Sequence, residues 1–354
     1  MKLYNKLIVL VLFSTALVHA QFNKKEAIKA TQNFIKEQNI PGLSVTVSHK
    51  GNNIWSEGFG YSDIENKKEV LPSSTQFRIA SISKTLTALG LAKLVDNKQL
   101  GFDESLYKYV PDFPQKEYDF TIRQIAGHTA GIRHYNGREF LINNKMSIVK
   151  GLDVFKDSDL LFKPGTRFKY STYGWNLLSV VIQNAANKDF FEFMDDEVFS
   201  PLKMNHTKLD IADEQNANRT KFYMIRKGKI TTGPQVNNEF KAAGGGFLST
   251  TEDLVLFGNE FIKPQIISNN SLSEITTSNI ISDNKKTNYG IGISISKTKN
   301  NTLKLSHSGG GIGASSMLLI YPKEDITIAI LTNLSRVKMR NYIKSLENIF
   351  LKKD

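Results

Sequence analysis

Apolar and polar residues follow different periods along the chain, and these periods predict an order of helices and strands. Residues 24–38 carry apolar side chains at helical spacing, which predicts an amphipathic helix. Residues 43–47 alternate with the two-residue period of a strand, "HKGNN" is typical of a turn, and apolar residues return between 54 and 61. This second pattern predicts a β-hairpin.

The middle of the chain favours helices. Helical spacing returns between residues 81 and 97. The residues expected to be buried there are Ile82, Leu86, Leu89 and Leu94. Residues 100 to about 240 are irregular, but "GWNLLSVVIQNAA" and "FFEFMDDEVFSPL" predict two further helices, the second stopped by Pro201.

Two segments have the pattern of a helix capping box, in which a Ser or Thr is followed three residues later by Gln or Glu. Thr121 and Gln124 predict a short helix before "AGHTAGI". Ser249 and Glu252 predict the start of another helix, which Leu254 and the apolar residues after it continue.

The C-terminal region returns to strand patterns in "LKLSHSG", "ASSMLLIYP" and "DITIAILTN", and an amphipathic helix follows in "MRNYIKSLENIFLKK". Strand signals therefore lie near both ends of the chain. We expect an α/β (α+β) fold in which both ends build one antiparallel sheet flanked by helices. The α/β part is expected at about residues 21–85 and 240–354, with an inserted, mainly helical part at about 86–239.

Composition narrows the class of protein. The chain has 354 residues and no cysteine, which excludes disulfides, thiolate nucleophiles and zinc–thiolate sites. The formal net charge is +12, but the lysines are spread over the chain as singles and pairs. Because no basic stripe with interleaved aromatic residues is present, we expect a solvated basic surface and no nucleic-acid partner.

The first twenty residues resemble a secretory signal peptide. Lys2 and Lys6 precede or flank the apolar stretch "LIVLVLFSTALV", and Val18 and Ala20 occupy the small-residue positions of a cleavage site. Cleavage after Ala20 would leave a domain of residues 21–354 in the periplasm or outside the cell, without stable membrane insertion. An uncleaved N-terminal anchor is the alternative.

Ser81 and Lys84 form the clearest candidate for chemistry. A serine hydroxyl is a weak nucleophile and needs a neighbouring base. Positions i and i+3 share one face of a helix, so Lys84 can reach the hydroxyl of Ser81. The helix N-terminus adds unpaired N–H groups and positive potential, which suit a developing oxyanion. Ser-x-x-Lys also occurs by chance in a chain this rich in both residues.

Two further segments complete a pattern with this pair. "FKYSTYGWNLL" contains Tyr170, Ser171 and Thr172 before a predicted helix, and "LSHSGGGIGASS" contains His307 and Ser308 on a predicted strand. In this order and spacing, the three elements resemble the serine beta-lactamase and penicillin-binding-protein family, in its class C-like branch. "HTAGIRHY", "KPGTRFKYSTYGWNLL" and "KAAGGGFLSTTEDL" are most similar to the mitochondrial beta-lactamase-like serine protease and its bacterial relatives.

The resemblance implies a role for each motif residue. Ser81 would be the acylated nucleophile, and Lys84 with Tyr170 would handle its proton. The backbone N–H groups of Ser81 and Gly310 would form the oxyanion hole. The residues implied to bind substrate are Thr172, His307, Ser308 and Gly309.

Two positions depart from the usual family pattern. Thr172 stands where many relatives have asparagine, and it lacks the paired donor and acceptor of an amide. His307 stands where beta-lactamases usually carry lysine, and its charge near pH 7 is conditional. Both changes weaken the case for a site tuned to the carboxylate of a beta-lactam.

Other candidates have ordinary interpretations. His128 and His134 lack a zinc-ligand pattern, so we expect them to structure their loop. Ser83 should face away from Ser81. Gly244 to Gly246 lack the Lys-Ser or Lys-Thr of a phosphate loop and predict a flexible turn beside the active site. Ser308 lacks the Gly-x-Ser-x-Gly elbow of a lipase nucleophile.

We therefore expect a secreted serine hydrolase that forms an acyl-enzyme on Ser81 with a peptide or ester, and that needs no metal or organic cofactor. A true beta-lactamase or a D-Ala-D-Ala-type carboxypeptidase is one alternative. A non-catalytic peptidoglycan-binding or assembly protein is another. The sequence indicates neither the natural substrate nor the oligomeric state.

Overall fold

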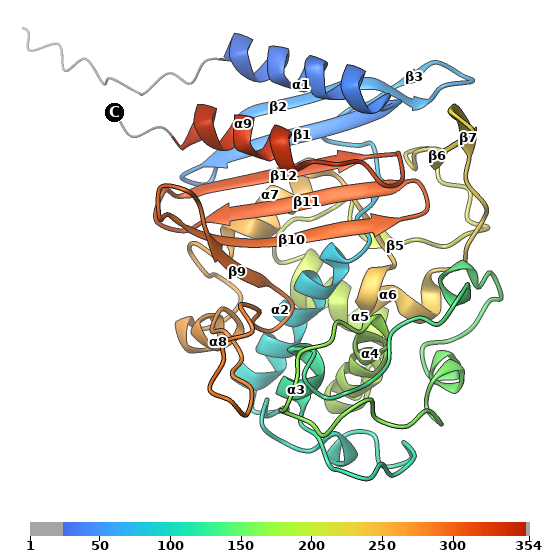
Figure 1. Cartoon of the computed structure of the whole chain (residues 1–354), viewed down its shortest axis with the longest axis vertical. Coiled ribbons are helices and arrows are strands. Elements are labelled where there is room, and N and C mark those ends of the chain that lie inside the picture. Colours follow the sequence, from blue (N-terminus) through green and yellow to red (C-terminus); the bar gives the residue numbers. More distant parts are fainter. Residues whose placement is uncertain (1–23, 352–354) are drawn as a thin grey trace, which may run out of the picture. The chain divides into compact units, whose positions relative to one another are not determined.

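A computed structural model of the protein describes residues 24–351 (Figure 1). The predicted signal peptide, residues 1–20, lies outside this part of the chain. The described chain forms two compact units. One unit combines the N-terminal segment up to Phe34 with the segment from Met339 onward, and the other contains Ile35–Lys338.

The smaller unit is made of helical segments from the two ends of the chain. Helix α1 (Lys24–Gln38) extends across the boundary at Phe34, and α9 (Arg340–Phe350) follows Met339. Within the unit, the rings of Phe34 and Tyr342 stack with centroids 4.4 Å apart. The hydroxyl of Tyr342 also lies 2.7 Å from that of Thr31. Both predicted amphipathic helices are thereby confirmed.

A seven-stranded antiparallel sheet forms the first layer of the larger unit, in the order β3-β2-β1-β12-β11-β10-β9 (Figure 1). Its strands are β1 (Gly42–His49), β2 (Asn52–Asp63), β3 (Lys68–Glu69), β9 (Ser294–Lys297), β10 (Leu303–Gly311), β11 (Ala314–Tyr321) and β12 (Ile326–Thr332). Leu43 of β1 pairs with Thr332 of β12, so the two ends of the chain meet in one sheet. The predicted fold class is confirmed.

Two smaller sheets lie outside this main sheet. One has the order β4-β8-β5, and the other is the hairpin β6-β7. Their strands are β4 (Phe77–Arg78), β5 (Lys208–Leu209), β6 (Tyr223–Arg226), β7 (Lys229–Thr232) and β8 (Phe247–Ser249). Because β4 pairs with β8, the segment that leads into Ser81 is tied to the segment that follows Gly244–Gly246.

Helices and the irregular segments between them make up the rest of the larger unit. Those described are α2 (Ile82–Asp96), α3 (Ile122–Ala126), α4 (Thr172–Ala186), α5 (Phe190–Met194), α6 (Ala242–Gly245), α7 (Thr251–Asn259) and α8 (Asn269–Ile275). Short 3-10 helices occur at Leu106–Lys108, Glu139–Leu141, Lys150–Val154 and Glu239–Lys241, and a π-helix at Asp195–Phe199. No helix of the described chain combines the length and apolar character needed to span a bilayer.

Helix α2 is more deeply buried than its pattern predicts. The expected apolar residues are buried, but Ser83, Thr85 and Thr87 are buried as well, because α2 contacts α4, α6, α8 and β10. The hydroxyl of Thr87 donates to the carbonyl of Ser83 at 2.9 Å, and that of Thr85 donates to Gly292 at 2.6 Å. Internal hydrogen bonds thus satisfy these polar groups.

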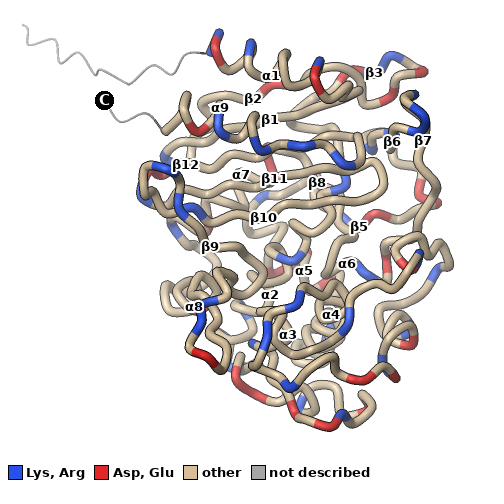
Figure 2. Tube along the Cα trace, viewed as in Figure 1, with Lys and Arg blue, Asp and Glu red and all other residues tan. Residues whose placement is uncertain are grey.

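One predicted helix cap is right and the other is wrong. Thr121 and Gln124 form both bonds of a capping box at the start of α3. At α7 the cap is Thr250, whose hydroxyl accepts the N–H of Asp253. Ser249 belongs to β8 instead, and its hydroxyl lies 2.8 Å from that of Thr207. Lys and Arg are interspersed with Asp and Glu along the described chain (Figure 2).

Candidate active site

Ser81 is the N-cap residue of α2, but its side chain does not cap the helix. An N-cap serine usually accepts a backbone N–H of the first turn. Here its Oγ lies 3.2 Å from the Nζ of Lys84 instead. The preceding Ala80 has φ = 46°, which is uncommon for a residue with a side chain. Such strained backbone is held by the surrounding structure and is typical of functional sites.

Lys84 is fully buried, and its amino group has three close partners. Its Nζ lies 3.2 Å from both Ser81 Oγ and Thr172 Oγ1, and it donates to the carbonyl of Gly244. Burial lowers the pKa of Lys84 well below its ordinary value, because the charged form loses its hydration. A lysine in this environment can carry a neutral amine, which is the form that accepts a proton.

Tyr170 completes the cluster from the segment before α4. Its ring centroid lies 4.9 Å from the Nζ of Lys84. Burial raises the pKa of Tyr170 well above its ordinary value, and a hydrogen bond with Ser81 offsets this only in part. The phenol therefore keeps its proton near neutral pH. Ser81 and Lys84, which are one helical turn apart, and Tyr170, which is distant in the sequence, thus lie close together.

Strand β10 brings the glycine-rich segment alongside Ser81. A Cβ added at Gly309 would lie 2.2 Å from the carbonyl oxygen of Ile79, and Ser316 of β11 donates to that same oxygen at 2.8 Å. Gly309 pairs with Ser316, and the next pair is Gly310 with Ser315. The strand therefore approaches the segment before Ser81 closely, and Gly310 is exposed one residue further along.

His307 is buried and has both ring nitrogens engaged inside the protein. Nδ1 lies 2.8 Å from the carbonyl oxygen of Ser308, so it carries the proton and donates. Nε2 lies 2.9 Å from the hydroxyl of Tyr289, from which it accepts. Burial, together with the nearby Lys84, lowers the pKa of His307 to about 3. The imidazole is neutral and presents no cationic N–H group.

His128 and His134 hold the start of α4. The backbone N–H of Ser171 donates to Nδ1 of His128 at 3.2 Å, and that of Thr172 donates to Nδ1 of His134 at 3.1 Å. Burial lowers the pKa of both, that of His134 to about 4. The two imidazoles therefore accept hydrogen bonds from consecutive residues next to Tyr170, as expected for a loop-structuring role. No cluster with metal-ligand geometry occurs in the described residues.

The remaining sequence candidates lie in or beside the cluster. The hydroxyl of Thr172 faces Lys84, and its role in binding substrate stays a prediction. Ser308 is exposed. Ser83 is buried, and its hydroxyl accepts the N–H of Phe247 at 3.3 Å. Gly244 lies beside the site as predicted, but it belongs to the short helix α6 and not to a turn.

Two features of the site were not found from the sequence. One is the hydrogen bond that the carbonyl of Gly244 accepts from Lys84. In the sequence, only the three consecutive glycines at 244–246 drew attention to this segment. Tyr289 fixes His307, and no motif marks it. Both depend on contacts between residues that are far apart in the chain.

This fold and cluster define a class of proteins. A sequence model of the beta-lactamase family, described as "Beta-lactamase", matches residues 27–345. The chain therefore belongs to the beta-lactamase family, a family of serine hydrolases that act by acyl transfer. The resemblance seen in the three motifs is confirmed.

Individual relatives support this assignment. The human "Serine beta-lactamase-like protein LACTB, mitochondrial" is 30% identical over an alignment 384 positions long, which spans 81% of this chain and 70% of that protein. An octameric penicillin-binding protein homologue from Pyrococcus abyssi has a TM-score of 0.81 at 24% identity, covering 93% of this chain and 78% of that one. A class C beta-lactamase has a TM-score of 0.78 at 18% identity, covering 94% and 96%. The two solved structures share the fold.

Proposed function

We propose that this protein is an exported serine hydrolase that transfers the acyl group of a peptide or ester first to Ser81 and then to water. One observation carries the proposal: the hydroxyl of Ser81, the buried amine of Lys84 and the phenol of Tyr170 lie together. A buried amine whose pKa is lowered by desolvation, next to a serine that caps nothing, is the arrangement that suits an activated nucleophile.

Acylation begins with transfer of the Ser81 proton to the neutral amine of Lys84. The Ser81 oxygen forms a bond with the substrate carbonyl carbon, and the negative charge moves to the carbonyl oxygen. The backbone N–H groups of Ser81 and Gly310 stabilise this oxyanion. The bond to the leaving group then breaks, and the leaving group takes the proton from Lys84 through the phenol of Tyr170.

Deacylation repeats these steps with water as the nucleophile. Water gives a proton to the amine of Lys84, directly or through Tyr170, and its oxygen attacks the acyl carbon. The ester bond to Ser81 breaks, and the Ser81 oxygen recovers the proton. Each cycle consumes one substrate molecule and one water and returns Ser81, Lys84 and Tyr170 to their starting protonation states, without a metal or organic cofactor.

The state of His307 favours substrates without a carboxylate at this position. A substrate carboxylate is bound best by a cationic N–H donor. His307 is neutral, and both its nitrogens are engaged by Ser308 and Tyr289. We therefore place a neutral peptide or ester ahead of a beta-lactam or a free D-Ala-D-Ala carboxylate. Because the human relative is named a serine beta-lactamase-like protein, beta-lactam hydrolysis is the second candidate.

The N-terminal pattern supports the exported part of the proposal, in which cleavage after Ala20 would release the mature enzyme into the periplasm or outside the cell. Sequencing the N-terminus of protein recovered from the host cell tests this part of the proposal. A mature chain that begins at Gln21 supports it, and a chain that retains residues 1–20 contradicts it.

The catalytic proposal is tested by labelling with a fluorophosphonate probe, followed by intact-mass and peptide analysis. Wild-type protein should carry one adduct on Ser81, and Ser81→Ala should carry none. Exposure to a panel of esters, D-peptides and penicillins then identifies which acyl group accumulates. Absence of any adduct would favour a non-catalytic, peptidoglycan-binding role, and rapid turnover of a chromogenic cephalosporin would favour a beta-lactamase.

A further inference from the structure

Three residues before Ser81, the buried side chain of Arg78 connects two other segments. Its Nε donates to Oδ2 of Asp210 at 2.6 Å, and its Nη1 donates to the carbonyl of Ile312 at 3.1 Å. The guanidinium also lies 3.7 Å from the ring centroid of Phe222. Ile312 comes two residues after Gly310, so one side chain links the chain before Ser81 to the chain after Gly310.

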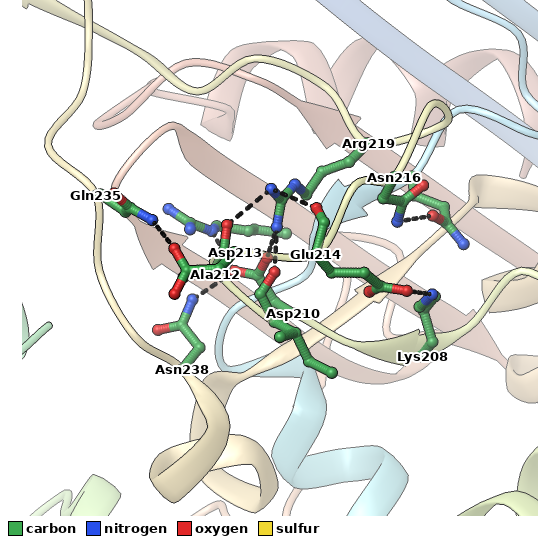
Figure 3. A network of polar contacts seen from close by, with 12 residues as sticks. Lys208, Asp210, Ala212, Asp213, Glu214, Asn216, Arg219, Gln235 and Asn238 are labelled. Carbon is green, nitrogen blue, oxygen red and sulfur yellow. Dashed lines mark hydrogen bonds and ion pairs between the residues drawn. The ribbon is translucent and has the colours of Figure 1, made fainter. Parts of the chain in front are cut away.

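Asp210 is fully buried and extends this connection to a third segment. Its carboxylate accepts from Nδ2 of Asn238 at 2.6 Å and from Nη1 of Arg219 at 3.2 Å (Figure 3). Its backbone N–H donates to the carbonyl of Gly246 at 2.9 Å. Asn238 and Gly246 flank helix α6, which contains the Gly244 carbonyl that accepts from Lys84.

The turn between β10 and β11 is also held from other sides. Ser335 Oγ accepts the N–H of Gly313 at 2.7 Å and donates to the carbonyl of Gly311 at 2.9 Å. Gly313 has φ = 62°, and a Cβ added there would lie 2.2 Å from Cβ of Phe222. The position of the turn is therefore set by Arg78, Phe222 and Ser335 together.

We propose that the Arg78–Asp210 pair is a positioning device that sets the separation of the Ser81 and Gly310 N–H groups. The pair acts through the backbone and does not touch the substrate. A guanidinium is a planar fork with fixed directions, so bonds to Asp210 and Ile312 from one side chain fix the two segments relative to each other. This inference rests on the proposed function, because it concerns the oxyanion hole of that reaction.

Such a device has a specific kinetic consequence. Oxyanion donors act on the charge that develops in the transition state, so their displacement slows bond formation without weakening ground-state binding. Loss of the fork in Arg78 should therefore lower kcat and leave KM almost unchanged. If Arg78 served stability alone, its loss would lower the melting temperature, but the kcat of the protein that remains folded would not change.

The test compares Arg78→Lys with Arg219→Lys. Both wild-type arginines pair with Asp210, but Arg219 otherwise donates to the carbonyls of Ile211, Ala212 and Glu214, and not to Ile312. The measured quantity is the rate of fluorophosphonate labelling at Ser81, which forms a tetrahedral adduct. We expect a roughly 10- to 100-fold loss for Arg78→Lys and less than about 3-fold for Arg219→Lys.

Ser335→Ala is a second variant, which removes two hydrogen bonds to the same turn without removing a buried charge. It should slow labelling by about 3- to 10-fold at a temperature where the variant and the wild type are both fully folded. For a p-nitrophenyl ester, the variants at Arg78 and Ser335 should lose kcat and keep KM.

The outcomes separate this inference from the proposed function. Wild-type protein that is not labelled at Ser81 would contradict the proposed function itself. Labelled wild type, with Arg78→Lys as fast as Arg219→Lys or with Ser335→Ala as fast as wild type, would overturn the positioning role alone.

Discussion

The amine of Lys84 lies 3.2 Å from the hydroxyl of Ser81, on the first turn of α2 and out of contact with solvent. The helix sets the direction in which the two side chains meet, and burial sets the protonation of the amine. The same burial that lowers the pKa of Lys84 also lowers the free energy of unfolding, because the amine loses its hydration in the folded state.

Replacement of Lys84 by Met should therefore abolish activity while changing how stability depends on pH. Labelling of Ser81 should fall by at least about 100-fold, because the proton acceptor is lost. Lys93→Met is the control on the same helix, about two and a half turns away. It should label at the wild-type rate, and a loss equal to that of Lys84→Met would contradict the assigned role.

The stability of wild type relative to Lys84→Met should rise between pH 7 and pH 10. Burial lowers the pKa of Lys84, so the folded protein binds fewer protons in this range than the unfolded chain, whose lysine has a pKa of about 10.4. Stability then increases with pH, by at most about 1.4 kcal/mol per pH unit. Urea denaturation of both proteins at several pH values measures this, and parallel curves would show that Lys84 is charged when folded.

Activity should rise with pH through one ionisation well below that of a free lysine, and this ionisation should belong to Lys84. Burial keeps Tyr170 protonated, so Tyr170→Phe should lower the rate without moving the midpoint of the pH profile. The pH dependence of kcat/KM for an ester substrate measures both values. A midpoint at or above that of a free lysine, about 10.4, or a midpoint that moves in Tyr170→Phe, would contradict this assignment.

A cation at position 307 should change substrate preference. His307 is neutral, with a pKa of about 3, because it is buried and lies near Lys84. His307→Lys should raise kcat/KM for a penicillin relative to a p-nitrophenyl ester by about tenfold, the effect of one charge-assisted contact. His307→Gln, which adds no charge, is the matched control. Equal ratios in the two variants would show that charge at this position does not select the substrate.

Adjacent glycines on β10 should respond differently to an added methyl group. A Cβ at Gly309 would lie 2.1 Å from Ser316 Oγ and 2.2 Å from the carbonyl oxygen of Ile79, whereas a Cβ at Gly310 meets no atom within 4 Å. Gly309→Ala should lower the free energy of unfolding by about 1–3 kcal/mol, and Gly310→Ala by less than about 0.5 kcal/mol. Thermal denaturation compares them, and equal melting temperatures would contradict the close approach of β10 to residue 79.

Much of the fold was predictable because local patterns determine it. The hairpin of β1 and β2, the start of α2 after Ser81 and the Thr121 capping box all follow from short-range spacing. The cap of α7 was misplaced by one residue because "LSTTED" offers several hydroxyls in a row. Ser249 pairs with Phe77 of β4 and its hydroxyl lies against that of Thr207, which leaves Thr250 as the cap, and both contacts are tertiary.

The sequence by itself determined the order of the elements, the one-turn spacing of Ser81 and Lys84 and the family to which the motifs belong. Tertiary structure decided the pKa shifts, because the desolvation that lowers the pKa of Lys84 and of His307 comes from segments distant in the chain. It also decided that Tyr289 engages His307 and that Arg78 reaches Ile312. Helical spacing is a local property of the backbone, whereas a pKa or a long-range hydrogen bond depends on everything that packs around the group.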